Sequence, residues 1–367
     1  LVYLILLLIV TDITRASIDS NQYQGLSDFY SSTYGDTWTN NSNWLQGDPC
    51  ENKWFGIDCD PNNQYVTSIV LNNNNLQGEI YDSFAFLIYL EEINFESNSI
   101  SGKLPASWKA FSNLQYMNLH SNHFASSLPE EWKALSQIRT LILDYNTGIT
   151  GTLPESWNFV HLEELSLSYD NVQGTLPSSY SSWSNWRIMY FGENQFSGTL
   201  PESWSNLTSL DIFSVSHNMI TGTIPASYVA LQCDMSFKYN SLVGTLPFFL
   251  NTQPKFDVDL EENYFHCPLP EWCSWKGNGA CEPCYNYTTT YSFSSSVSVS
   301  PSVSVFPIYS NNASEQSTKD PLNTKEIIAI IGGIATILTC LGACIGVGVK
   351  ALQLYHIKHQ IKLLKED

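Results

Sequence analysis

Apolar and polar residues alternate in short stretches that recur about every 24 residues through most of the chain. In each copy the fourth and sixth positions are apolar and their neighbours are mostly polar. This period of two predicts a short strand with one buried face. Copies must stack to bury that face, so we expect their strands to pair in one curved parallel sheet. The copies begin at Val66, Leu90, Leu114, Ile138, Leu162, Trp186, Leu210, Gln232 and Lys255.

The ninth position of each copy is polar and nearly constant. A buried asparagine amide both donates and accepts hydrogen bonds, so we expect it to pair with backbone groups where the chain leaves the strand. An ionised Asp170 only accepts, which predicts a weaker rung there, with Asn171 as a neighbouring donor. The ninth residues are Asn74, Asn98, Asn122, Asn146, Asp170, Asn194, Asn218, Asn240 and Asn263.

A Gly-x-Leu/Ile-Pro-x-x-Trp/Tyr motif fills the second half of most copies. Glycine permits a turn, proline is excluded from a sheet ladder, and the aromatic ring fills the space under the convex side, so we assign these rings to the core. The period and consensus are typical of leucine-rich repeats. They predict an α/β-type solenoid, a right-handed superhelix with a curved parallel sheet. The clearest motifs stand at 102–108, 151–157, 174–180, 198–204 and 222–228.

Two apolar segments lie outside the repeats. Residues 1–10 are almost wholly apolar and small residues follow up to Ala16, which predicts a secretory signal peptide whose true start is missing. Residues 327–349 carry no charge. This length spans about 34 Å and predicts one transmembrane helix. Lysines follow it, so we expect a single-pass type I protein of the plasma membrane with its ectodomain outside.

The membrane segment and the tail leave alternatives open. Small residues such as Ala329 and Gly333 favour a dimer or a co-receptor contact through the spanning helix, but glycine is frequent in such helices anyway. The basic tail fits either an amphipathic helix on the inner leaflet or a simple stop-transfer signal.

Cysteine positions agree with an oxidising exterior, because they cluster at the two ends of the repeats, where a solenoid needs caps. We expect Cys50 to pair with Cys59. The C-terminal four allow three pairings, and their Cys-Glu-Pro-Cys motif also fits a redox or zinc site. Cys233 is either a buried free thiol or an intermolecular link. The C-terminal four are Cys267, Cys273, Cys281 and Cys284.

The segment before the membrane span is rich in serine and threonine and has no hydrophobic period, so it predicts a stalk. Glycosylation sequons stand at Asn40, Asn206, Asn286 and Asn312. The expected order is a signal peptide (1–16), an N-terminal cap (17–65), about nine repeats (66–266), a Cys-rich cap (267–284), a stalk (285–324), a transmembrane helix (327–349) and a basic cytoplasmic tail (350–367).

Two sets of motifs carry a family resemblance over roughly residues 20–285. The first set resembles the N-terminal cap of plant-type extracellular leucine-rich repeat proteins. It consists of Phe29-Tyr30-Ser31, Gly35-Asp36-Thr37-Trp38, Asn43-Trp44 and Trp54 to Cys59. The Gly-Thr-Leu-Pro-Glu-Ser-Trp motifs and the ending at 263–273 are similar to kinetoplastid surface antigens and related membrane-associated proteins. The resemblance implies cell-surface recognition or a coat. Because eighteen residues follow the span, we expect neither a receptor with a kinase nor a lipid-anchored antigen.

Variable strand positions that point away from the core form the concave face of such a fold. Tyrosine and isoleucine gather there in the middle copies, and acidic residues flank them. Tyrosine patches with polar rims are typical of recognition surfaces, although exposed tyrosine is also common in strands. We predict ligand contacts at Tyr116, Ile142, Tyr145, Tyr169, Ile188, Tyr190, Ile212 and Tyr239.

Composition and motifs narrow the function class. The net charge of −19 disfavours nucleic acid and favours a basic or hydroxyl-rich partner. No catalytic sequence motif is present, so we expect no enzyme and no cofactor. The acids at Asp257, Asp259, Glu261 and Glu262 lack a calcium-loop pattern, and we expect no metal. The sequence predicts a non-catalytic surface protein that binds an extracellular protein or glycan; the alternative is a structural coat.

Overall fold

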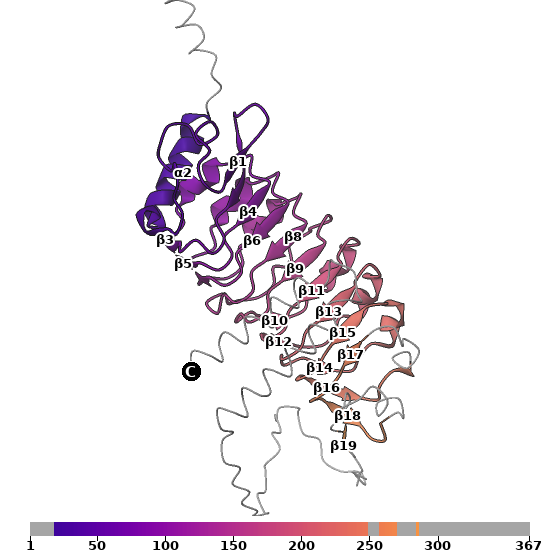
Figure 1. Ribbon diagram of the computed structural model, residues 1–367. Helices are drawn as coiled ribbons and strands as arrows, with labels where there is room; N and C mark the ends of the chain where they lie inside the picture. Colours follow the sequence, from indigo (N-terminus) through magenta and orange to yellow (C-terminus); the bar gives the residue numbers. More distant parts are fainter. Residues whose placement is uncertain (1–17, 249–256, 270–283, 286–367) are drawn as a thin grey trace, which may run out of the picture. The chain divides into compact units, whose positions relative to one another are not determined.

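The structure is a computed structural model that describes residues 18–248, 257–269 and 284–285 (Figure 1). The expected signal peptide, transmembrane helix and tail, and all but the first residue of the stalk, lie outside the described residues, as do Cys273, Cys281, Asn286 and Asn312. Within the described part, no helix combines the length and the apolar character that crossing a bilayer requires.

One ten-stranded sheet runs through all the copies. Its strands pair in parallel at the repeat offset, as in Ser68 opposite Glu92 and Glu92 opposite Tyr116. The first pair, β1 and β2, is antiparallel, which the repeat pattern did not predict. In order the strands are β1 (Ile57–Cys59), β2 (Val66–Val70), β4 (Glu92–Asn94), β6 (Tyr116–Asn118), β8 (Thr140–Ile142), β9 (Glu164–Ser166), β11 (Ile188–Tyr190), β13 (Ile212–Ser214), β15 (Asp234–Ser236) and β17 (Val258–Asp259).

A second row of short parallel strands follows the first, in the segment that the glycine and proline pattern assigned to turns. The prolines stay outside these strands, but the residues before them pair. Isolated parallel bridges, such as Thr152 to Gln173 and Thr199 to Thr221, link neighbouring copies where the strands of this row are interrupted. The strands are β3 (Gln77–Glu79), β5 (Ser99–Gly102), β7 (His123–Phe124), β10 (Gln173–Thr175), β12 (Gln195–Ser197), β14 (Thr221–Gly222), β16 (Ser241–Gly244), β18 (Tyr264–His266) and β19 (Cys284–Tyr285).

Single 3-10 turns complete most copies and place the motif aromatics in the core. Trp108 lies over Trp132, with ring centroids 6.0 Å apart and planes 3° apart, and Trp132 over Trp157 at 6.3 Å. All three are buried, as are Tyr180, Trp204 and Tyr228, which confirms their structural assignment. These turns are η2 (Asp82–Phe86), η3 (Ala106–Ala110), η4 (Glu130–Ala134), η5 (Ser178–Ser182), η6 (Glu202–Asn206) and η7 (Ala226–Ala230), and a further one, η1 (Gly35–Thr37), lies in the N-terminal cap.

The asparagine column joins each copy to the one before it. Asn122 donates to the carbonyls of Phe95 and Leu119, at 2.9 and 3.1 Å, and accepts from the amide of Ile100 at 3.0 Å. The rung at Asp170 is incomplete. Its Oδ1 accepts from the amide of Asn146 at 2.7 Å, while its buried Oδ2 has no partner.

Burial raises the pKa of Asp170 to about 9. This effect outweighs the hydrogen bond from the Asn146 amide, which by itself lowers the pKa. The carboxyl group is therefore largely protonated at neutral pH and occupies an asparagine position in its neutral form. Asn171 donates to the carbonyl of Thr147 at 2.6 Å, so it does not supply the donor expected beside Asp170.

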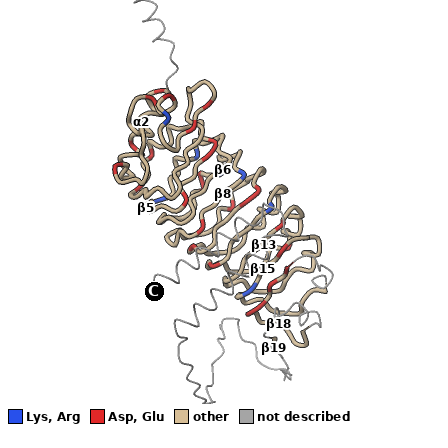
Figure 2. The backbone as a smooth tube through the Cα atoms, in the orientation of Figure 1, with Lys and Arg blue, Asp and Glu red and all other residues tan. Residues whose placement is uncertain are grey.

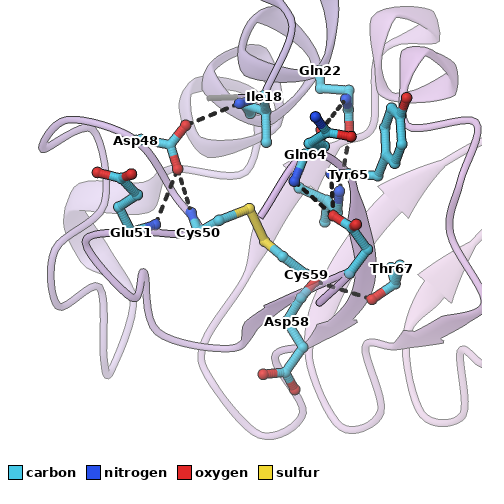
Figure 3. Close-up of a disulfide and its surroundings, with 12 residues drawn as sticks. Ile18, Gln22, Asp48, Cys50, Glu51, Asp58, Cys59, Gln64, Tyr65 and Thr67 are labelled. Atoms are coloured by element: carbon cyan, nitrogen blue, oxygen red, sulfur yellow. Dashed lines mark hydrogen bonds between the residues drawn. A yellow bond between two sulfur atoms is a disulfide. The ribbon is translucent and has the colours of Figure 1, made fainter. Parts of the chain in front are cut away.

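The N-terminal cap covers the open end of the core. Helix α2 (Ser20–Ser32) begins where Asp19 accepts from the amides of Asn21 and Gln22, and it buries Leu26 and Phe29. The predicted disulfide between Cys50 and Cys59 closes the following loop (Figure 3). Its stabilisation comes mainly from restricting the unfolded chain.

The C-terminal disulfide joins Cys267 to Cys284, one of the pairings that the sequence left open, and so ties β18 to β19. Cys233 is a buried free thiol, which decides against an intermolecular link at this position.

Candidate functional site

The concave face is formed by the outward side chains of the ten-stranded sheet, where register fixes which residues are neighbours. The third positions of successive copies stand side by side, so Tyr116 in β6 is followed by Thr140 in β8 and then Glu164 in β9. The fifth positions form a second row that includes Ile142, Ser166 and Tyr190. Acidic positions are frequent along these strands and basic ones few (Figure 2).

Aromatic rings stack where the chain leaves the strands. Tyr145 and Tyr169 have ring centroids 4.3 Å apart and planes 13° apart, and the ring of His120 stands edge-on to Tyr145 at 5.2 Å. Further along, His217 stacks on Tyr239 at 4.2 Å. These contacts join neighbouring copies, so the rings form short ladders along one side of the face.

The backbone at these stacked tyrosines is left-handed. Tyr145 has a φ of 58° and Tyr169 a φ of 60°. The same holds at the eighth position of every copy from Ser97 to Glu262. For residues other than glycine and asparagine, this backbone conformation costs roughly 1–2 kcal/mol. The turn out of the strand therefore imposes the conformation, and the variable side chain follows it.

A polar cluster of four residues, which we name the Asp144 cluster, lies beside the tyrosine pair. Both carboxylate oxygens of Asp144 accept from the hydroxyl of Ser166 at 2.6 Å, and its Oδ1 also accepts from the amide of Ser168 at 2.5 Å. His120 Nδ1 lies 3.8 Å from Asp144 Oδ2 on the other side. His120, Asp144 and Ser166 are buried, although they stand at positions that alternate with the core residues of their copies.

The order of groups in the Asp144 cluster bears on its chemistry. In a serine nucleophile triad the histidine stands between the serine and the acid, so that it can take the hydroxyl proton. Here the acid stands between, and Ser166 donates to Asp144. The cluster therefore fixes three copies relative to one another and holds the floor of the face rigid.

Glu164 stands next to this cluster, on β9. Burial, together with the nearby charge of Asp144, raises the pKa of Glu164 to about 7. At neutral pH the centre of the face therefore carries a carboxyl group poised between its neutral and charged forms. A cationic group placed above it would favour the charged form.

Basic side chains on this sheet are paired with acids. Arg139 Nη1 lies 2.7 Å from Glu163 Oε1, Arg187 Nη2 lies 2.5 Å from Asp211 Oδ2, and Lys238 Nζ lies 3.1 Å from Asp259 Oδ2. These exposed pairs contribute little to stability. They leave the surplus charge of the face acidic.

All eight residues predicted as ligand contacts reach the surface of this sheet or of its turns. Tyr169 and Tyr239 are exposed and the other six are half-buried. Tyr145 and Tyr169 are in contact, whereas Tyr239 belongs to the separate stack with His217. Their role as ligand contacts stays a prediction. The sequence contained Asp144 and Glu164 in its strand columns, but only the register between copies brings them together.

The sequence analysis expected no metal site and predicted sugar attachment at its asparagine sequons. Over the described ranges, no group of three or more histidine, cysteine or acidic side chains is arranged to hold a metal ion. Asn206 is exposed at the end of η6, and Asn40 is half-buried, its side-chain oxygen accepting from Ser42. Glycosylation at these two positions stays a prediction.

Comparison with known proteins agrees with the repeat fold. Residues 64–124 match the family model described as leucine rich repeat. No curated protein matches the chain. The ectodomain of the membrane receptor kinase GASSHO1/SCHENGEN3 from Arabidopsis thaliana is similar, with a TM-score of 0.64 and 24% identity over 70% of this chain and 31% of that one.

Two further solved structures show the same fold. A TDR receptor matches with a TM-score of 0.51 and 27% identity over 53% of this chain and 35% of that one. A plant ice-binding protein matches with a TM-score of 0.57 and 19% identity over 68% of this chain and 88% of that one. The chain spans about a third of the length of the two receptors. The resemblance to kinetoplastid antigens stays a prediction. The chain carries leucine-rich repeats and folds like the ectodomains of plant membrane receptor kinases.

Proposed function

We propose that this chain is a non-catalytic recognition protein of the cell surface that binds an extracellular protein or glycan on its concave face. The observation that carries the proposal is the stacked pair of Tyr145 and Tyr169 beside the Asp144 cluster, with the half-buried Glu164 next to the same cluster. Each of these side chains occupies a position that varies between copies and that the repeat scaffold does not need. Scaffold positions account for the core without them.

The chemistry of this centre favours a ligand with a basic or hydroxyl-rich group. Tyrosine rings offer a large contact area at a small cost in side-chain entropy. The half-buried Glu164 offers a carboxylate that a cation or a hydroxyl group can pair with. The Asp144 cluster fixes the strands that carry these groups, so little ordering is left for the moment of binding.

Proteins with a similar fold give independent support for a peptide or protein ligand. The Arabidopsis receptor kinase HAESA has been solved with the peptide hormone IDA and the co-receptor SERK1, and it matches this chain with a TM-score of 0.50 and 22% identity over 67% of this chain and 44% of that one. We therefore infer that a peptide is the first ligand class to test and a glycan the second.

The same proposal places the chain in the membrane with its repeats outside the cell. The two disulfides among the described residues and the exposed sequon at Asn206 fit an extracellular environment. The uncharged run at 327–349 would anchor the chain, and a dimer or co-receptor contact would form through that segment.

A binding screen tests the proposal. Cells that display the full chain are probed with arrays of extracellular peptides, proteins and glycans, and Glu164→Gln serves as a matched variant because it keeps the size of the side chain. The proposal expects selective binding of at least one probe and a weaker signal with the variant. A structural coat without a specific ligand, the second candidate, expects no selective probe and no difference between the two chains.

A further inference from the structure

Five consecutive copies present a threonine at the same point of the second strand row. We name Thr152, Thr175, Thr199, Thr223 and Thr245 the threonine row. All five are exposed. Each stands directly before the Leu/Ile-Pro step of its copy, in or next to the short strands β10 to β16 (Figure 1). The row lies on a different sheet from the proposed ligand-binding face.

Contacts with glycine give these threonines one common orientation. The methyl carbon of Thr152 lies 2.7 Å from the point where a β-carbon on Gly174 would stand. Thr175 over Gly198, Thr199 over Gly222 and Thr223 over Gly244 repeat the contact at 2.8 Å. Each methyl group therefore covers the bare α-carbon of the next copy. Because the methyl direction fixes the other substituents of the β-carbon, the hydroxyl groups of these four residues point the same way.

Within the part of the chain that the structure describes, the hydroxyl groups of the threonine row make no hydrogen bonds to the scaffold, unlike nearby hydroxyl groups in the same strand row. Two residues before Thr199 and Thr223, the side chains of Ser197 and Thr221 donate to the carbonyls of Gly174 and Gly198, at 3.4 and 3.0 Å, and so serve the scaffold. No hydrogen bond from the hydroxyls of the threonine row to another described residue is present. These exposed hydroxyl groups are therefore left to solvent, in a line that repeats once per strand.

Charge and aromatic side chains are absent from the strand residues around this row. The five-residue stretches that end at the five threonines contain no ionisable residue, although the whole chain carries a net charge of −19. Their one aromatic residue, Phe196, is fully buried. The threonine row is limited to these copies. The equivalent position is Lys103 two copies before Thr152, and it is Pro268 in the copy after Thr245.

We propose that the threonine row is an ice-binding face. Its hydroxyl and methyl groups repeat about every 5 Å, the spacing of strands in a sheet, and this is the order of the repeat between water molecules in ice. Within the stretches that end at the threonines, an ionic ligand finds no charge and a sugar finds no exposed ring to stack on; the exposed ring nearest in sequence to these threonines, Phe248, stands beyond the last of them. A neutral occupant that is itself periodic and built from hydroxyl groups fits the row. Water held along the threonine hydroxyls would continue into the ice lattice.

The test measures ice affinity of the full chain. We expect the protein to concentrate in a slowly growing ice hemisphere and to inhibit ice recrystallisation. Thr175→Glu with Thr199→Glu puts two charges in the row and should lower the inhibitory activity at least ten-fold. Tyr145→Ala with Tyr169→Ala changes the other sheet and should leave the inhibition unchanged. Thermal unfolding of each variant checks that it is folded.

A milder pair guards against an effect on folding. Thr175→Val with Thr199→Val keeps the methyl contacts with Gly198 and Gly222 and removes only the hydroxyl groups, so ice affinity should fall while stability is kept. Exclusion of the wild-type chain from ice overturns the proposal. So does full ice activity in the glutamate variant, or binding of the row to a crystalline polysaccharide in place of ice.

Discussion

The ring of Tyr145 lies against the ring of Tyr169, 4.3 Å away and nearly parallel to it, although both residues have a left-handed backbone. The stack joins two copies at a variable position of the repeat. It is made by side chains that the scaffold does not require, on a backbone turn that glycine would adopt more easily.

The left-handed backbone at Tyr169 leads us to expect that a glycine variant there is more stable than an alanine variant. Tyr169→Gly and Tyr169→Ala lose the same ring, but only glycine adopts a φ of 60° without penalty. The glycine variant should therefore be the more stable of the two, by roughly 1 kcal/mol. Chemical denaturation of both variants measures the difference. An alanine variant at least as stable as the glycine variant would show that the position is not strained.

Asp170 predicts an unusual dependence of stability on pH. Its pKa is raised from 3.8 to about 9 in the folded chain, so the folded state holds a proton that the unfolded state releases. The stabilisation is fully present below about pH 4 and is lost as the pH rises to about 9. Asp170→Asn should remove this slope and complete the rung.

The asparagine variant should also be more stable at neutral pH, by roughly 1–3 kcal/mol, because it satisfies a buried group. Urea denaturation of both chains between pH 5 and 9 provides the measurement. Asp58→Asn is the matched control, because it makes the same change at an exposed aspartate. Parallel pH profiles for wild type and Asp170→Asn would contradict the assignment.

Much of this fold could be predicted from the sequence, because each buried strand position and each asparagine repeats at a constant interval. The second row of strands was missed. Residues such as Gly174 and Thr175 have the composition of a turn, yet they pair because stacking of the copies brings their backbones together. Propensity describes one copy alone, whereas pairing depends on its neighbours.

The candidate site was predicted in part for a related reason. The tyrosines were visible as variable residues at exposed strand positions. The Asp144 cluster was not, because His120, Asp144 and Ser166 belong to three copies and share no local motif. Their burial follows from hydrogen bonds between copies, which a residue-by-residue reading cannot supply.

The stacked tryptophans predict where the core is most sensitive. Trp132 is buried between Trp108 and Trp157. Trp132→Ala should lower the free energy of unfolding by about 3–5 kcal/mol, since it leaves a large cavity. Tyr81→Ala, at a side chain that is 57% exposed, is the control and should change it little. Equal losses from the two variants, measured by denaturation, would contradict the assignment of Trp132 to the core.

Glu164 predicts that binding of a cationic ligand depends on pH. Because burial raises its pKa to about 7, the carboxyl group gains its charge as the pH rises through neutrality. A basic peptide should therefore bind more tightly at pH 8 than at pH 6, by several-fold. Glu164→Gln should bind weakly and equally at both. Calorimetric titration with an arginine-containing peptide tests this, and a wild-type affinity that rises toward pH 6 would have the wrong sign.

The most direct test of the proposed recognition function is the affinity of the full chain for the strongest probe from the binding screen, compared with the variant Tyr145→Ala with Tyr169→Ala. We expect at least a ten-fold weaker affinity for the double variant and an unchanged affinity for Tyr81→Ala, with all three chains folded. An unchanged affinity of the double variant would contradict recognition through this face.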